Sequence, residues 1–557
     1  MIAAHRLRSV SAVSAVAGLV AMSALWGAPS AAAVEPPAID PAAVPPDGQP
    51  GPQQAMRQGA LCTRVGTLPG TDYRIQPKYM DLLNLPEAWK FGRGAGVSVA
   101  LIDTGVSPHP RLPTLVGGGD YIEGGDGLTD CDAHGTWIAS LIAAWPNDGN
   151  SPPPPPREVQ PPPAGQGPPP AEPGAADQST PPASAPTAAE GPAGWTSATA
   201  AAPGVEPAAM GQLPSPEAPA EAAGDPPYPA APPPWPPPDA FSGIAPEVKL
   251  ISIRQSSLAW SPQGAFGDSD PVTRRKAGDV ATMASAIVHA ANMGAKVINI
   301  SEVSCMPANK IVDQRALGAA IRYAAVDKDV VIVAAAGNLR GPDSDCKQNP
   351  LSNPLTPDDP RNWAGVTTVV TPAWFSDYVL TVGAVNAAGN PLPDLSIAGP
   401  WVGIAAPGTD VMSLSPRDAG LINAEENREQ QLVAPAGTSF SAAIVTGTAA
   451  LVRAKFPQLT AHQVINRLIA TARPPAAGVD NEVGHGIVDP VAALTYDLPA
   501  GEPLPPQNQS SPLVLPPPPP PRDMTPVWVA LGGVAAIAVL ATGTVGLSAL
   551  LRERKGR

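Results

Sequence analysis

The stretch VALIDTGV, residues 99–106, decides the fold. An uninterrupted apolar run leads to Asp103, and the chain then turns at a Thr-Gly pair. A short continuous apolar run of this kind is typical of a strand buried on both faces, as in a parallel sheet that is covered by helices. In such sheets, functional residues lie at the carboxyl ends of the strands. Asp103 is therefore the first candidate site residue.

The rest of the globular sequence repeats this pattern. Short apolar runs predict buried strands at residues 97–102, 249–253, 297–300, 330–335 and 379–385. Longer segments between and after them predict helices at residues 134–144, 279–292, 316–328, 439–455 and 461–471. Strands that alternate with helices predict an α/β fold, with a parallel sheet and helices on both of its faces.

Two further motifs contain a histidine and a serine, the residue types that act together with a carboxylate in acyl transfer. His134 opens a helix in DAHGT, residues 132–136, and Ser439 opens a small-residue helix in GTSFSA, residues 437–442. Singly, each motif has a plain structural interpretation, as a turn, a structural histidine or a helix N-cap. An aspartic protease would need a second Asp-Thr-Gly, which the sequence lacks. Together, in the order Asp103, His134, Ser439, they predict acyl transfer by a serine nucleophile, a histidine base and an orienting carboxylate.

These motifs resemble the active-site signatures of the subtilase family, and the segment AAAGN at residues 334–338 resembles that family's oxyanion-hole segment. The resemblance implies a subtilisin-like serine endopeptidase that needs no cofactor. It also implies that Asn338 donates its side-chain amide to the oxyanion, together with the backbone N–H of Ser439. The strand edges of a subtilase peptide groove correspond here to Ser301, Ala334, Ala335, Ala336 and Gly337. Glu302-Val303 replaces the family's usual Leu-Gly, so the pocket preferences of other subtilases do not transfer.

Both ends of the chain carry targeting signals. Residues 1–33 combine early arginines, a short apolar run and a small-residue end, which predicts a secretory signal peptide rather than a first membrane helix. Residues 526–551 lack charge and are long enough to cross a bilayer, and the tail at 552–557 is basic. Because positive charge stays on the cytoplasmic side, we expect a single-pass protein of the inner membrane, with the tail cytoplasmic and the protease domain extracytoplasmic.

Composition divides the exported part into segments. We expect an N-terminal arm at residues 34–85 and a catalytic domain at 86–498, followed by a proline-rich stalk at 499–525. Pro, Ala and Gly dominate an insertion at residues 147–240, which predicts disorder because so little apolar surface can be buried. The net charge of −14 disfavours nucleic acid as a partner.

The exported part holds four cysteines, and an even number in an oxidising compartment predicts two disulfides. No cysteine or histidine spacing suits zinc, and we expect no metal. The strands that precede Cys305 and Cys346 are joined by one crossover helix, and such a crossover places successive strands side by side. The loops after them then emerge at the same sheet edge, which predicts a Cys305–Cys346 bond. Cys62 then pairs with Cys131 and ties the arm beside the catalytic histidine.

The whole layout of signal peptide, arm, protease domain, stalk and single C-terminal helix resembles the mycosins, and the long insertion is most like that of mycosins of the fifth ESX-type system. Mycosins are membrane-anchored proteases associated with mycobacterial type VII secretion systems. The resemblance implies protein substrates, the secretion membrane complex as a partner, and an arm that stays attached. The alternative is a structural subunit that stabilises the complex, with proteolysis secondary.

Overall fold

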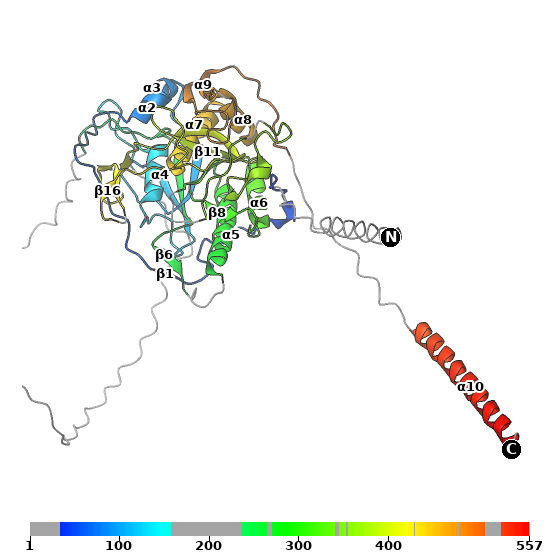
Figure 1. Cartoon of the computed structure of the whole chain (residues 1–557). Coiled ribbons are helices and arrows are strands. Elements are labelled where there is room, and N and C mark those ends of the chain that lie inside the picture. Colours follow the sequence, from blue (N-terminus) through cyan, green and yellow to red (C-terminus); the bar gives the residue numbers. More distant parts are fainter. Residues whose placement is uncertain are drawn as a thin grey trace, which may run out of the picture.

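A seven-stranded parallel sheet forms the centre of the protein (Figure 1). The computed structural model describes residues 34–156, 236–263, 270–339, 345–352, 355–427, 429–476, 478–506 and 525–555. Every pairing in the sheet is parallel, in the order β12-β11-β9-β7-β3-β5-β4. These strands are β3 (Ser98–Asp103), β4 (Leu115–Asp120), β5 (Lys249–Arg254), β7 (Val297–Ile300), β9 (Val331–Ala335), β11 (Val379–Val385) and β12 (Val402–Pro407).

Helices cover both faces of the sheet, and the side chains of β3 alternate between two cores. Val99 and Leu101 pack in the core that includes α4 (His134–Ala143), α7 (Thr438–Lys455) and α8 (Ala461–Thr471). Ala100 and Ile102 pack in the core that includes α5 (Pro271–Asn292) and α6 (Arg315–Arg322). A strand buried on both faces needs apolar residues at consecutive positions, which is why its sequence is a continuous apolar run. The expected α/β fold is confirmed.

The expected elements agree with the structure within one or two residues, except for two helices. Helix α5 begins at Pro271 rather than residue 279, because Asp270 caps it by accepting a hydrogen bond from the backbone N of Thr273. The helix expected at residues 316–328 is α-helical only over Arg315–Arg322 and continues as a π-helical turn over Tyr323–Asp327. The strands β4 and β12 at the two sheet edges were not among the expected elements.

Short elements surround the main sheet. They are η1 (Pro41–Ala43), β1 (Met56–Gln58), β2 (Val65–Gly66), α2 (Lys78–Leu83), α3 (Leu85–Ala88), η2 (Trp89–Phe91), β6 (Trp260–Pro262), β8 (Ser304–Pro307), η4 (Trp363–Gly365), β10 (Thr368–Thr371), β13 (Ser413–Leu414), β14 (Leu421–Ile422), β15 (Ala424–Glu426), β16 (Leu432–Val433) and α9 (Pro490–Thr495).

The segment from residue 34 onward packs along the domain. Ile39 is only 1% exposed and lies against α6, where a Cβ added at Gly318 would approach its Cδ1 to 2.8 Å. Further on, β1 pairs with β6 and β2 pairs with β15, both antiparallel. The Pro/Ala-rich start of the arm is thus held by apolar contacts, and its second half by strand pairing.

Two disulfides join the expected pairs of cysteines. The Cys62–Cys131 bond links the arm to the loop that precedes α4, and the Cys305–Cys346 bond links β8 to the segment after β9. The parallel pairing of β7 with β9 is the arrangement from which the second bond was predicted. The disulfide prediction is therefore confirmed in both pairs.

One helix among the described residues is long and apolar enough to cross a membrane. It is α10 (Thr525–Lys555), with a candidate span at Val527–Ser548 and a mean hydropathy of 1.9 (Figure 1). The expected signal peptide at residues 1–33 lies outside the described residues, as does most of the expected disordered insertion, residues 157–235.

Candidate active site

The three predicted motifs meet at the carboxyl edge of the sheet. Asp103 is the last residue of β3, His134 is the first residue of α4, and Ser439 is the second residue of α7. Helix α7 packs across β7, β9, β11 and β12, and this packing brings its first turn to the same edge. The fold therefore brings residues more than 300 positions apart in sequence to one place.

Asp103 and His134 form a tight pair. Nδ1 of His134 lies 2.7 Å from Oδ1 of Asp103, which also accepts a hydrogen bond of 2.7 Å from the backbone N of Thr104. Asp103 is 1% exposed, so its carboxylate is shielded from water. Since a carboxylate accepts, the proton of the neutral imidazole stays on Nδ1 and Nε2 is left as the basic nitrogen.

A network of hydrogen bonds fixes the two motifs against each other. The hydroxyl of Thr104 accepts from the backbone N of Gly135 at 2.9 Å and donates to Asp130 at 2.9 Å. Asp130 in turn accepts from the backbone N and hydroxyl of Thr136 at 2.8 and 2.6 Å. A Cβ at Gly135 would lie 1.9 Å from the carbonyl of Gly105, so the two turns touch directly. Burial raises the pKa of Asp130 to about 7, although its three hydrogen bonds act in the opposite direction. The sequence motifs did not single out Asp130.

Ser439 is nearly buried, with 5% of its surface exposed. Its Oγ lies 3.4 Å from the carbonyl of Ser301, a long hydrogen bond. Ser439 and His134 are both described by the structure, and there is no hydrogen bond between them. Catalytic hydrogen bonds are often long or poorly aligned without a substrate and tighten when one binds. The ring of Phe440, the next residue, packs between His134 and Trp137, with ring centroids 6.1 and 5.8 Å apart.

Asn338 lies beside the start of α7. Its Oδ1 accepts hydrogen bonds from the backbone N of Thr438 at 2.9 Å and from the Thr438 hydroxyl at 3.1 Å. These contacts orient the amide so that Nδ2 lies on the side of Gly437, where an added Cβ would approach it to 3.2 Å. Gly337, at φ 98°, has the backbone conformation that a side chain would strain, and it donates to the Thr438 hydroxyl at 3.1 Å. Asn338 is therefore held at the start of α7, with its amide oxygen bonded to Thr438 and Nδ2 on the side of Gly437.

The predicted groove residues line the same edge but bury their side chains. They are Ser301, Ala334, Ala335, Ala336 and Gly337, and all five are buried. Ala335 packs in the core with α7, whereas Ala334 and Ala336 pack in the core with α5. A peptide could therefore contact these residues only through their backbone.

Glu302 approaches the candidate base from the end of β7, and sequence reasoning noted only that it departs from the family pattern. Its Oε1 lies 3.6 Å from Nδ1 of His134. Burial disfavours the imidazolium, but the charges of Asp103, Glu302 and Asp130 outweigh burial and raise the pKa of His134 to about 10. Burial also raises the pKa of Glu302, to about 7, against the opposing charge of His134. Of the described residues, Asp103, His134 and Glu302 form the one group with potential metal-ligand atoms all within 4.8 Å.

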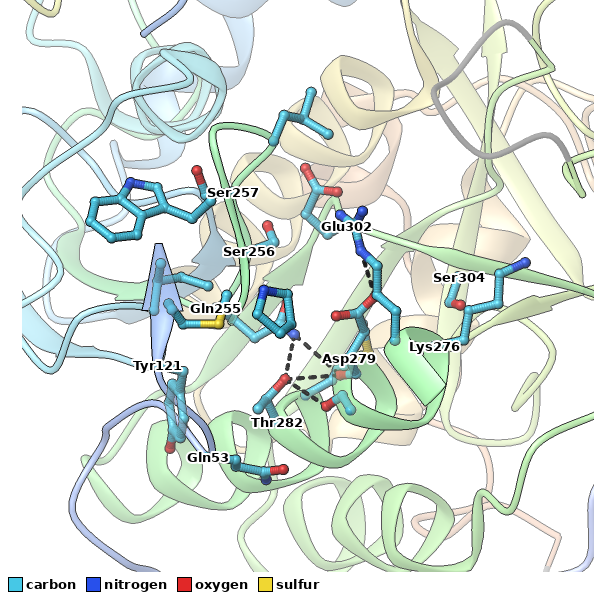
Figure 2. A pocket seen from close by; sticks show the side chains of 18 of the residues that line it. Gln53, Tyr121, Gln255, Ser256, Ser257, Lys276, Asp279, Thr282, Glu302 and Ser304 are labelled. Atoms are coloured by element: carbon cyan, nitrogen blue, oxygen red, sulfur yellow. Dashed lines mark hydrogen bonds and ion pairs between the residues drawn. The ribbon is translucent and has the colours of Figure 1, made fainter. Parts of the chain in front are cut away.

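A pocket of ≈ 340 Å³ opens beside this group (Figure 2). Its lining includes Glu302, Ser257 after β5, Asp279 and Thr282 on α5, and Gln53 from the arm. The pocket is therefore bordered by Thr104 and Glu302, which adjoin the candidate catalytic residues in sequence or space, and not by Asp103, His134 or Ser439 themselves.

Comparisons with known proteins agree with this geometry. The subtilase family model matches residues 220–486, a span that includes Asn338 and Ser439 but not the Asp103 and His134 motifs. Mycosin-5 of Mycobacterium tuberculosis is 57% identical over 96% of this chain and 95% of its own length. Mycosin-2 of the same organism is 49% identical over 98% of both chains. The chain belongs to the mycosins.

Solved mycosin structures have the same fold. A chain in the structure of an intact ESX-5 inner membrane complex is 56% identical, with a TM-score of 0.66, covering 92% of this chain and 100% of that one. The crystal structure of MycP1 from Mycobacterium smegmatis is 39% identical, with a TM-score of 0.65 and coverage of 85% and 98%. This mycosin is therefore a subtilisin-like serine protease, as its sequence predicted.

Proposed function

We propose that Asp103, His134 and Ser439 are the catalytic triad of a serine endopeptidase. The observation that carries this proposal is the 2.7 Å contact between Asp103 and His134, which leaves Nε2 free to act as the base. Ser439 loses its proton to Nε2 as its Oγ attacks the peptide carbonyl. His134 then returns the proton to the leaving amine, and water releases the acyl group by the same steps in reverse order.

Asn338 completes the site as a donor to the oxyanion. Its Nδ2 acts together with the backbone N–H of Ser439 at the first turn of α7, whose partial positive charge also favours an anion. This stabilisation acts where negative charge develops in the transition state, so it affects turnover more than binding.

The domain division and topology are also part of the proposal. The arm, protease domain, stalk and membrane helix keep the boundaries expected from sequence, with the protease domain outside the inner membrane and the C-terminus in the cytoplasm. The basic tail at residues 552–557 supports this orientation. The similar chains from an ESX-5 inner membrane complex and from its periplasmic assembly support a type VII secretion complex as the partner. Its substrates are then proteins at that complex.

A serine-directed fluorophosphonate probe tests the triad. Ser439→Ala is expected to abolish labelling of the purified protein without unfolding it. Ser441→Ala is the matched control, because Ser441 lies on the same turn of α7 and its Oγ donates only to the carbonyl of Ala406 at 2.9 Å. Undiminished labelling of the Ser439→Ala variant would refute the assignment.

The same variant separates proteolysis from the alternative structural role. Ser439→Ala is expected to fail to restore secretion in a deletion strain, although it still assembles in the membrane complex. Full restoration of secretion would instead favour the structural role. The close Asp103–His134 contact and the oriented Asn338 amide favour proteolysis as a function of this chain.

A further inference from the structure

The candidate base His134 has two carboxylates at the same nitrogen. Asp103 lies 2.7 Å from Nδ1, and Glu302 lies 3.6 Å from the same atom. The Glu302 side chain is 35% exposed and that of His134 is 26% exposed, so water screens this second contact only in part. A triad needs one carboxylate to fix the imidazole. Glu302 therefore requires a separate explanation.

Acidic groups approach this pair from several elements. Besides Asp103 on β3 and Glu302 after β7, Asp130 lies in the loop before α4, and Glu425 lies on β15; both interact electrostatically with His134. Asp132, Asp103 and Asp279 act on Glu302 in the same way. The cations at the pocket are already engaged: Lys276 bonds Asp345 at 2.6 Å, and Arg275 lies 3.9 Å from Asp279. The described surroundings of His134 are thus strongly negative.

We propose that Glu302 is a positioning residue whose carboxylate, 3.6 Å from Nδ1 of His134, acts on the imidazole through its charge and moves the pH range of catalysis upward. The inference rests on the triad proposed above. Asp103 accepts the Nδ1 proton and fixes the tautomer that directs Nε2 to the nucleophile. The negative charge of Glu302 favours the protonated imidazole, which cannot act as a base. The enzyme therefore becomes active only at a higher pH than it would with Asp103 alone.

The sign of the effect follows from the charge. A general base works in its neutral form, so activity rises with pH through the pKa of His134. A nearby negative charge raises that pKa by about one to three units. Because the Glu302 side chain is partly exposed, we expect its effect on the pKa of His134 to lie at the lower end of this range. Removing the charge moves the acid limb of the pH profile down by about one unit. At pH values above the Glu302 pKa of about 7, where Glu302 is ionised and His134 is still protonated, this is a roughly tenfold faster reaction.

The test is the second-order rate constant for fluorophosphonate labelling of Ser439 in the full-length protein, measured against pH. It needs no knowledge of the substrate. Glu302→Gln keeps the size of the side chain and removes the charge, and Glu302→Leu introduces the residue usual in other subtilases. Both are expected to shift the acid limb downward by about one pH unit. Glu302→Asp retains the charge at a greater distance and is expected to lie between them and the parent.

Glu426→Gln is the matched control. It removes one negative charge from β15, but Glu426 pairs with Arg64 at 3.2 Å and no interaction with His134 is present among the described residues. The acid limb of this variant is therefore expected to stay in place. An unshifted limb in Glu302→Gln and Glu302→Leu would overturn the inference, as would an equal loss of rate at every pH, which indicates a merely structural role. Labelling of Ser439→Ala would instead overturn the proposed triad, so the two failures are distinguishable.

Discussion

At the scale of single residues, the geometry of the candidate site depends on which polar atoms already have hydrogen-bond partners. Thr438 donates twice to Oδ1 of Asn338, and this leaves Nδ2 on the side of Gly437. Thr104 links the Asp103 and His134 motifs through its hydroxyl, which is bonded on both sides. Each catalytic group is thus held by a neighbour that has no role in the chemistry itself.

Asn338→Ala is expected to lower kcat by about 100- to 1000-fold, the loss typical of removing such a donor in subtilisin, and to change KM little. The reason is that the amide stabilises charge present only in the transition state. Steady-state kinetics on a protein substrate, with labelling of Ser439 as a check on folding, measures the effect. A variant in which only KM rises would show that Asn338 contacts the substrate rather than the oxyanion.

At the scale of elements, three kinds of interaction attach the arm to the rest of the domain: side-chain packing, strand pairing and a disulfide. Ile39 packs on α6. Strand β1 pairs with β6, and β2 adds a third strand to the β15–β16 pair. The Cys62–Cys131 bond joins residues 69 positions apart in sequence. This disulfide ends three residues before His134, so it joins the arm to the catalytic loop. The arm therefore behaves as part of the folded enzyme, and it also supplies Gln53 to the pocket wall.

Replacing Cys62 and Cys131 together by serine is expected to lower the free energy of unfolding by about 2–4 kcal/mol, because the unfolded chain regains the entropy of an open loop. Denaturant unfolding measures this change. The matched control is the double serine variant of Cys305 and Cys346, which opens a loop of 41 residues that does not include the arm. Only the first variant is expected to release the arm to limited proteolysis. Equal release in both variants would contradict a specific tether.

At the scale of the whole molecule, the catalytic domain is assembled from two stretches of chain on either side of the proline-rich insertion. Their ends lie together: Nδ2 of Asn147 donates to the carbonyls of Pro237 at 2.9 Å and Pro236 at 3.3 Å. Close by, Arg111 forms a buried ion pair of 2.8 Å with Asp239. The chain thus leaves and re-enters the domain at almost the same point.

Joining residue 156 to residue 236 through a glycine linker is expected to leave stability and Ser439 labelling unchanged, because Asn147, nine residues before the junction, already contacts Pro236. Thermal unfolding and fluorophosphonate labelling of the shortened chain measure this. Deletion of a stretch of equal length that removes β3 is a negative control that must unfold. Loss of folding in the linker variant would show that the insertion contributes to the core.

The sequence alone was sufficient for the fold class, the three motifs and the disulfide pairs. The reason is that these features are local or topological. A strand buried on both faces is continuously apolar in sequence, as at residues 99–102, and a motif of a few residues carries its own backbone geometry. The pairing of Cys305 with Cys346 followed from the neighbouring parallel strands, which a right-handed crossover requires.

Only the tertiary structure decided which further side chains reach the site. Nothing local marks Asp130 as the partly buried carboxylate that joins Thr104 to Thr136, because its partners belong to two motifs that meet only in the folded chain. Glu302 stood out in sequence as a departure from the family pattern, but its 3.6 Å approach to His134 depends on the direction of its side chain at the end of β7. Distances between charges from different elements set their electrostatic coupling, and those distances exist only once the sheet is formed.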